Sequence, residues 1–258
     1  MACATLHFHS SALAKACAMT VIVPEGSVGP PPFPVCYLLH GLSDDHTSWA
    51  RQTSLERYVA GLPLIVVMPD GGRGFYCDAV GGPAYERYLL DDVIGFVDRT
   101  FHTMPEQQGR VIGGLSMGGY SAVKLALKYP QLFCSAVAHS AALDVRRRIE
   151  RPEIAEEMRR IFGPAPGGGS DDPYALAATM DRRLLPALRL DCGLEDGLLE
   201  ENRTFHRHLE QLGIPHAYTE CPGAPTWEYW DCHVQEALAF HPRALGLGDC
   251  RSAGNDTL

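Results

Sequence analysis

One serine stands at the centre of a short glycine-flanked motif, Gly114-Leu115-Ser116-Met117-Gly118. The strand-like run Arg110–Gly113 precedes it, and residues 119–129 after it carry apolar side chains at helical spacing. A serine on such a tight strand-to-helix turn projects its hydroxyl from the end of the strand, and glycine two residues before and after it avoids a clash. The motif in this context predicts that Ser116 is the nucleophile of an acyl-transfer reaction.

Acyl transfer also requires N–H donors directed at the oxygen that becomes negative in the transition state. The backbone N–H of Met117, directly after the serine, is one candidate. The other is expected in the loop after an earlier strand, and His40-Gly41-Leu42 follows the apolar run Val35–Leu39. We therefore predict an oxyanion hole formed by the N–H groups of Leu42 and Met117.

The same loop offers side chains of the types that bind divalent metals, namely His40, Asp44, Asp45 and His46. A metal-dependent hydrolase is therefore an alternative. No third element carries ligands at a matching spacing, and the oxyanion hole explains the glycine in the loop. We expect neither a metal nor another cofactor.

An acid that orients a catalytic base should follow the nucleophile in the chain, at the end of a later strand. The run Ala187–Cys192 is such a strand, and Asp196 lies in the turn after it. Glu195 and Asp191 are alternatives near the same strand end, and a turn carboxylate there can also cap the next helix. Asp196 is the prediction, and its two neighbours stay open as alternatives.

Short runs with strand character alternate along the chain with longer amphipathic stretches, which is typical of an α/β domain with a mostly parallel sheet. The expected strands are Ala4–His9, Cys17–Val23, Val35–His40, Leu64–Met68, Arg110–Gly113, Cys134–His139, Ala187–Cys192 and His216–Cys221. The expected helices are Glu86–Phe101, Gly119–Tyr129, Pro152–Phe162, Glu200–Leu212 and Trp227–Phe240. The first two strands are close enough to pair as an antiparallel lead-in.

The length of 258 residues, with 46% hydrophobic side chains, is enough for one sizeable core and too short for two ordinary domains. We expect a single domain over residues 1–242. Within it, residues 144–186 form an insertion with a glycine-rich loop, which is expected to cover the site as a short lid. Residues 243–258 lack a periodic apolar pattern and are expected to form a flexible tail.

The net charge of −9 disfavours nucleic acid and anionic lipid as partners. The longest apolar run, Leu62–Met68, is far too short to span a bilayer. The nine cysteines include no Cys-x-x-Cys pair, and the N-terminus has no signal-peptide pattern, so we expect a cytoplasmic protein with reduced thiols. The basic cluster Arg146-Arg147-Arg148 is expected on a solvated face.

Five motifs together resemble one enzyme family: HGLSDDHTSW at 40–49, VMPDGGR at 67–73, GLSMGGY at 114–120, DCGLED at 191–196 and WEYWD at 227–231. They are similar to the tributyrin-esterase branch of the esterase D-like α/β-hydrolases, whose relatives include S-formylglutathione hydrolases, acetylxylan and feruloyl esterases, and mycolyltransferases. The resemblance implies an α/β-hydrolase fold with an eight-stranded, mostly parallel sheet and helices on both faces. It also implies that Ser116 is the nucleophile, Asp196 the acid, and Leu42 with Met117 the oxyanion hole.

One departure from the family concerns the general base. The last motif of the family reads roughly Pro-Gly-Gly-His-x-Trp-x-x-Trp, whereas residues 222–230 here read PGAPTWEYW, so Pro225 stands where the basic histidine is expected. Proline has no titratable group and cannot accept the proton of Ser116. His139, at the end of the strand after the nucleophile helix, and His233, eight residues after Pro225, are the candidates to replace it.

The expected function is a serine carboxylesterase that hydrolyses short-chain or small acyl esters through an acyl-enzyme on Ser116. Loss of the base from a serine triad lowers turnover by about 10⁶-fold, so we expect weak activity unless another residue serves. The alternative is a catalytically impaired hydrolase that acts as a binding or regulatory protein. The expected partner is a small-molecule ester, and relatives of this kind often form homo-oligomers.

Overall fold

A computed structural model describes residues 1–247 of the chain. Its centre is one eight-stranded sheet with the order β1-β2-β4-β3-β5-β6-β7-β8. The strands are β1 (Ala2–Ser10), β2 (Lys15–Val23), β3 (Val35–Leu39), β4 (Ile65–Pro69), β5 (Arg110–Leu115), β6 (Ser135–His139), β7 (Ala187–Gly193) and β8 (Ala217–Cys221). Every neighbouring pair from β4 to β8 is parallel, while β2 runs antiparallel to β1 and to β4. The predicted fold class and the antiparallel lead-in are both confirmed.

The central strands are apolar on both sides because helices cover both faces of the sheet. In β3, Val35, Tyr37 and Leu39 pack into one core, and Cys36 and Leu38 pack into the other. All five side chains are almost completely buried. This is why the strand reads as a continuous apolar run and not as an alternating one.

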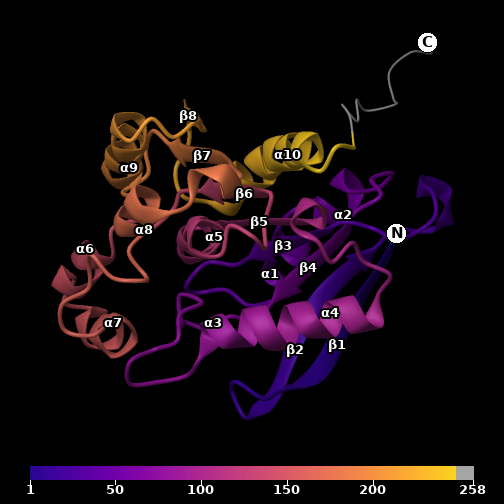
Figure 1. Cartoon of the computed structure of the whole chain (residues 1–258), viewed down its shortest axis with the longest axis horizontal. Helices are drawn as coiled ribbons and strands as arrows, with labels where there is room; N and C mark the ends of the chain where they lie inside the picture. The colour runs from indigo at the N-terminus through magenta and orange to yellow at the C-terminus, as the bar shows by residue number, and fades with distance from the viewer. Residues whose placement is uncertain (248–258) are drawn as a thin grey trace.

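Each face of the sheet has its own set of helices (Figure 1). One core contains side chains of α1 (Ser48–Gln52), α2 (Leu55–Tyr58) and α10 (Trp227–Ala244). The other contains side chains of the segment α3 (Tyr85–Arg87), η2 (Tyr88–Val93) and α4 (Ile94–Thr100), together with α5 (Met117–Lys128) and α9 (Leu199–Gln211). The carboxyl ends of the parallel strands therefore meet at one edge, between the two layers of helices.

The boundaries of some predicted helices were wrong. The predicted helix over residues 86–101 contains a π-helical turn, Tyr88–Val93, and the one predicted from Pro152 begins at Ala155. The last helix continues through Pro242 to Ala244, because His241 and Pro242 are buried and the packing of the helix extends to them. The first two residues of the predicted tail 243–258 are therefore helical, and residues 248–258 lie outside the described part.

The insertion between β6 and β7 forms α6 (Val145–Glu150), α7 (Ala155–Phe162), α8 (Pro173–Thr179) and the single turn η4 (Arg182–Leu184). Its helices α6 and α7 lie at the left of Figure 1, away from α10. The prediction of a fully solvated basic cluster was wrong at Arg148. This residue is buried and forms an ion pair with Glu201 at the start of α9, because the insertion folds back onto that helix.

Within residues 1–247, no helix is both long and apolar enough to cross a membrane. The eight cysteines of this range are free thiols, four of them buried. Cys250 lies beyond it.

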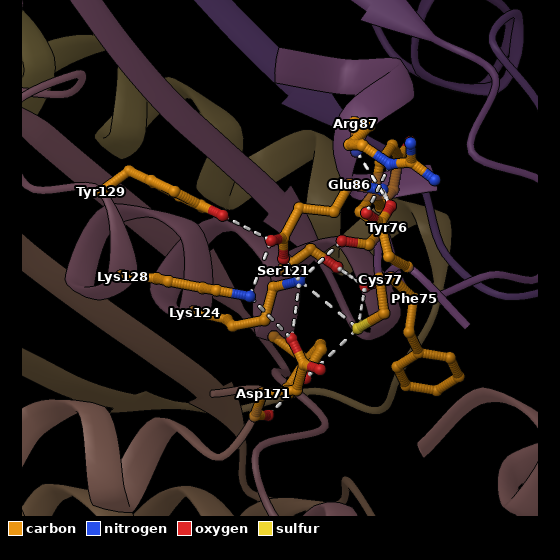
Figure 2. Close-up of polar contacts among 12 residues, drawn as sticks. Phe75, Tyr76, Cys77, Glu86, Arg87, Ser121, Lys124, Lys128, Tyr129 and Asp171 are labelled. Carbon is orange, nitrogen blue, oxygen red and sulfur yellow. Dashed lines mark hydrogen bonds and ion pairs between the residues drawn. The ribbon is translucent and has the colours of Figure 1, made fainter. Parts of the chain in front are cut away.

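A charged cluster of α5 is largely buried against the turn before α3 (Figure 2). The Lys124 ammonium, fully buried, donates to Glu86 Oε2 and to the carbonyl of Tyr76, both at 2.6 Å. Lys128 Nζ and Tyr129 Oη each donate to Glu86 Oε1 at 2.6 Å. The cluster thus ties the nucleophile helix α5 to the turn that contains Tyr76.

The cluster should make the stability of the protein sensitive to acid. Burial alone would raise the pKa of Glu86, but the ammonium of Lys124 and the three hydrogen bonds outweigh it and hold this pKa below the usual 4.5. The stabilisation is therefore fully present above about pH 5 and is lost as the pH falls through the lower folded-state value. Urea unfolding at about pH 7 and pH 3.5 should show a larger loss of stability for the natural chain than for Glu86→Gln. Equal losses would contradict this origin.

Candidate functional site

The serine of the glycine-flanked motif lies on a strained turn between β5 and α5. Ser116 has φ 51° and ψ −111°, a conformation that side-chain-bearing residues rarely adopt. Its N–H donates to the carbonyl of His139 at 2.9 Å, which fixes the turn against β6. A Cβ at Gly114 would lie 2.7 Å from both Gly118 C and Leu39 O, so only glycine fits there. The predicted reason for the flanking glycines therefore agrees with the geometry.

Ser116 lines a cavity of about 760 Å³ at the carboxyl edge of the sheet. This size lies within the range of small-molecule sites. Apolar side chains of the wall include Leu42, Phe75, Ala142, Ile154 and Leu198. The α6 segment and the start of α9 supply charged groups, namely Arg147, Arg148, Glu150, Arg151 and Glu201. The insertion therefore forms part of the cavity wall, and its action as a lid stays a prediction.

Asp196 is the one of the three predicted carboxylates that lines this cavity. It is 7% exposed, and its Oδ1 accepts the N–H of Leu198 at 2.8 Å. Its Oδ2 is buried and accepts no hydrogen bond from any described residue. A carboxylate that orients a histidine would use this second oxygen, and among the described residues no histidine contacts it.

The two alternative carboxylates have other partners. Asp191 accepts from Tyr229 Oη at 3.1 Å, and its other oxygen lies 2.8 Å from His139 Nδ1. Glu195 accepts the N–H of Gly223 at 2.5 Å, and its own N–H donates to the Gly223 carbonyl at 3.1 Å. Glu195 therefore holds the loop between β8 and α10 beside the cavity.

Of the predicted donors of the oxyanion hole, Met117 directly follows the serine in the chain and Leu42 lines the same cavity. Met117 is the first residue of α5, so its N–H has no partner within the helix. Leu42 lines the cavity, and the loop before it is fixed by His40, whose Nε2 accepts the N–H of Gly71 at 2.9 Å. At the start of α5 the helix dipole adds positive potential near the serine.

Arg73 connects this oxyanion loop to the insertion. Its guanidinium donates to Glu157 of α7 through Nε at 2.7 Å and Nη2 at 2.8 Å. The third nitrogen donates to the carbonyl of Leu42 at 3.4 Å. Helix α7 of the insertion and the loop that contains Leu42 are therefore held by one side chain.

Pro225 lies in the wall of the same cavity as Ser116 and Asp196. Its side chain is exposed, and the turn around it is closed by the N–H of Thr226, which donates to the Ala224 carbonyl at 2.8 Å. Among the described residues that line the cavity there is no histidine. The position predicted to lack the base is therefore next to the other predicted site residues.

Neither candidate replacement for the base lines the cavity. His139 is completely buried, its Nδ1 pairs with Asp191, and its Nε2 has no hydrogen-bond partner among residues 1–247. Its ring packs near Trp49, which belongs to the core on the α10 face. His233, on α10, stacks on Tyr229 and lies 3.2 Å from Glu236 Oε1. The structure does not bring either imidazole to the Ser116 hydroxyl.

Sequence reasoning missed the pair Arg148 and Glu201 in the cavity wall. Glu201 also accepts the N–H of Asp144, so it holds both ends of the first turn of α6. Burial raises the pKa of Glu201 to about 7, although the guanidinium of Arg148 opposes the shift. The two residues are more than fifty positions apart in the sequence, and no local pattern indicates that they meet.

The metal-site alternative has no geometric support in the oxyanion loop. His46 Nδ1 lies 2.9 Å from Thr20 Oγ1, and His40 is used by Gly71. Across residues 1–247 no group of three or more His, Cys, Asp or Glu side chains is arranged to hold a metal ion.

Comparisons with known proteins agree with this geometry. The family model named Esterase matches residues 10–241. An acetyl esterase of Caldicellulosiruptor saccharolyticus is 27% identical over 260 residues, which cover 93% of this chain and 98% of that protein. The fluorophosphonate-binding serine hydrolase FphF of Staphylococcus aureus has a TM-score of 0.86 at 30% identity, covering 93% of this chain and 98% of that one.

A second solved structure is an S-formylglutathione hydrolase, FrmB of Staphylococcus aureus, with a TM-score of 0.82, 29% identity and the same coverage of 93% and 98%. The family match extends over nearly the whole described chain, and both solved structures are named as hydrolases. The chain therefore belongs to the Esterase family and is a carboxylic ester hydrolase with the α/β-hydrolase fold.

Proposed function

We propose that the protein hydrolyses small acyl esters through an acyl-enzyme on Ser116, with a rate reduced by the missing general base. The observation that carries this proposal is the shared cavity of Ser116, Asp196, Leu42 and Pro225. It holds a nucleophile, an acid and an oxyanion loop, and no imidazole among its described lining residues. Such a site can stabilise a tetrahedral intermediate but has no side chain that takes the proton of the serine.

The chemistry of the leaving group then decides which esters react. Attack by Ser116 on the acyl carbon releases the serine proton to water, and collapse of the intermediate expels the alcohol oxygen. An alkyl alkoxide needs a proton at that step, whereas p-nitrophenolate leaves as a stable anion. We therefore expect activated esters to react slowly and simple alkyl esters to react hardly at all.

The proposed substrates are esters with short acyl groups. Phe75, Ala142 and Leu198 give the cavity of Ser116 apolar surface, and its volume of about 760 Å³ suits a small ester. The acetyl esterase relative supports a short acyl chain by its name. The free thiols among the described cysteines support a reducing, cytoplasmic setting.

Turnover of p-nitrophenyl acetate and butyrate tests the proposal. The natural chain should release p-nitrophenol slowly, and Ser116→Ala should reduce the release to the uncatalysed background. Release that continues unchanged in Ser116→Ala would contradict the acyl-enzyme on this serine.

Labelling by a fluorophosphonate probe should be slow, even though the structural relative FphF binds such probes. Phosphonylation requires an activated serine, and the Ser116 hydroxyl has no basic partner among the described residues that line the cavity. Labelling is measured as band intensity against time, with Ser116→Ala as the unlabelled control. Labelling within seconds at micromolar probe would show an activated serine and would favour a base that moves in, such as His139 or His233.

A second candidate function is ligand binding without turnover. It is favoured by the unpartnered Oδ2 of Asp196, because a site without its base retains its cavity and its oxyanion loop. A protein of this kind would bind a non-hydrolysable ester analogue and show no Ser116-dependent turnover of any ester.

A further inference from the structure

The second oxygen of Asp196 is the least satisfied group of the site. The residue is 7% exposed, Oδ1 accepts from Leu198, and Oδ2 has no donor among residues 1–247. A buried carboxylate oxygen without a donor is unfavourable, and a ligand that brings an N–H to it gains a charge-assisted hydrogen bond. Asp196 therefore favours a ligand with a hydrogen-bond donor, and an N–H group is one such donor.

The three arginines of the cavity wall, Arg147, Arg148 and Arg151, form no hydrogen bond with Asp196 Oδ2. Arg148 is paired with Glu201, and Arg147 Nε lies 3.5 Å from Asp144 Oδ2. The neighbours of Asp196 in the wall, Gly197 and Leu198, are uncharged. No described cation therefore neutralises the acid of the site.

The cavity that Asp196 lines is shared with the predicted nucleophile and with a proline ring. Ser116, Asp196 and Pro225 all line it, and Pro225 is exposed. A five-membered heterocycle that donated one N–H to Asp196 could direct its other nitrogen toward Ser116, because the two nitrogens of imidazole point in different directions.

We propose that the space between Ser116, Asp196 and Pro225 binds a nitrogen base of the ligand, one that carries both an N–H and a lone pair, as imidazole does. This inference rests on the proposed hydrolysis at Ser116. The base arrives either as a free small molecule or as a group on the ester itself. The chain supplies the acid, the nucleophile and the oxyanion loop.

The proton balance of the reaction closes with such a base. The lone pair takes the proton of Ser116 as Oγ bonds to the acyl carbon and the carbonyl π pair moves to oxygen. The resulting cation, held by Asp196, gives that proton to the alcohol oxygen as the bond from carbon to this oxygen breaks. In the second half the free base, or the imidazole of the released alcohol while that alcohol is still bound, takes a proton from water, the water oxygen attacks the acyl carbon, and Ser116 leaves with the proton.

Free imidazole tests the site with p-nitrophenyl acetate as substrate. Because imidazole itself attacks this ester, the rate with Ser116→Ala is subtracted. The natural chain should show a saturable increase of about 10-fold or more, and Pro225→Gly, which removes the ring beside the approach to Asp196, should show a larger one. The isomers 4-methylimidazole and 1-methylimidazole have equal size, but neutral 1-methylimidazole has no N–H for Asp196, so only the first should accelerate the reaction.

Asp196→Asn is the matched variant for the acid. The amide can keep an oxygen for the N–H of Leu198, but it places an NH₂ group where Oδ2 stood and cannot accept from imidazole. We expect the saturable increase to disappear in this variant. The acetate ester of 2-(imidazol-4-yl)ethanol, compared with phenethyl acetate, tests a base carried by the substrate, and it should be hydrolysed about 10-fold faster or more.

A rate increase that saturates with free imidazole supports a site for a free base. Faster hydrolysis of the imidazole ester than of phenethyl acetate supports a base carried by the substrate. If neither effect is observed and Pro225→His is active, the inference is overturned and the proposed function remains. The inference is overturned together with the proposed function when Pro225→His is also inactive and no variant shows turnover that depends on Ser116.

Discussion

Pro225→His should raise kcat/KM toward p-nitrophenyl acetate by about 10²–10⁴-fold. This is less than the roughly 10⁶-fold effect of the base in a serine triad, because p-nitrophenolate leaves without a proton. The position lies in the cavity wall with Ser116 and with the unpartnered oxygen of Asp196. An imidazole introduced there can donate to Asp196 and accept the serine proton, which completes the set of groups that an ester hydrolase of this kind uses. Steady-state release of p-nitrophenol measures the gain.

Two controls separate a new base from a change in loop shape. Pro225→Gln removes the proline and adds a polar side chain without a base, so it should stay near the rate of the natural chain. Pro225→His combined with Ser116→Ala should show background only. A gain in Pro225→Gln as large as in Pro225→His would mean that the proline restricts the loop and that a base is already present elsewhere.

Lys124→Met should lower the free energy of unfolding by about 3 kcal/mol, at the lower end of the cost of breaking a buried ion pair. The ammonium is completely buried and holds Glu86, the carbonyl of Tyr76 and, at 3.5 Å, Asp171. Glu86 keeps two other donors, which limits the loss. Methionine fills the volume of the lysine stem, so the loss reflects the charge and its hydrogen bonds (Figure 2).

Lys128→Met is the matched control, because it removes a second ammonium from the same carboxylate. Lys128 is 18% exposed, so water can replace part of its contacts, and we expect a loss of about 1 kcal/mol. Urea denaturation at neutral pH, with the slope of the transition compared between variants, gives both values. A loss for Lys124→Met no larger than that for Lys128→Met would contradict a special contribution of the buried ammonium to the stability of the fold.

Much of the architecture could be predicted from the spacing of apolar residues. The eight strands and the helices α5, α9 and α10 are long or strongly patterned, and each was expected within a few residues of its place. Short helices such as α1, α2 and α6 span only one or two turns, too few to show a period. The π-helical turn at Tyr88–Val93 could not be recognised from this sequence, because its residues have the same apolar spacing as an ordinary helix.

The candidate site was predictable only where local geometry determines the residue type. The glycine-flanked turn at Ser116 depends on its own backbone, so it could be found from the sequence. The choice of Asp196 over Asp191 and Glu195 depends on which side chain faces the cavity, and the strand end alone leaves that open. Arg148 looked solvated because its partner, Glu201, is distant in the sequence and meets it only when the insertion folds back.

The φ and ψ of Ser116 have a consequence for the free energy of the whole chain. A backbone held in such a sparsely populated conformation costs about 1–3 kcal/mol, and this cost is present whether or not an ester is bound. Other contacts of the fold must offset this cost, including the hydrogen bond from the N–H of Ser116 to the carbonyl of His139. Residue 116 is thus a position where thermal stability and chemical reactivity oppose each other, and selection for stability alone would act against the serine that the turn presents.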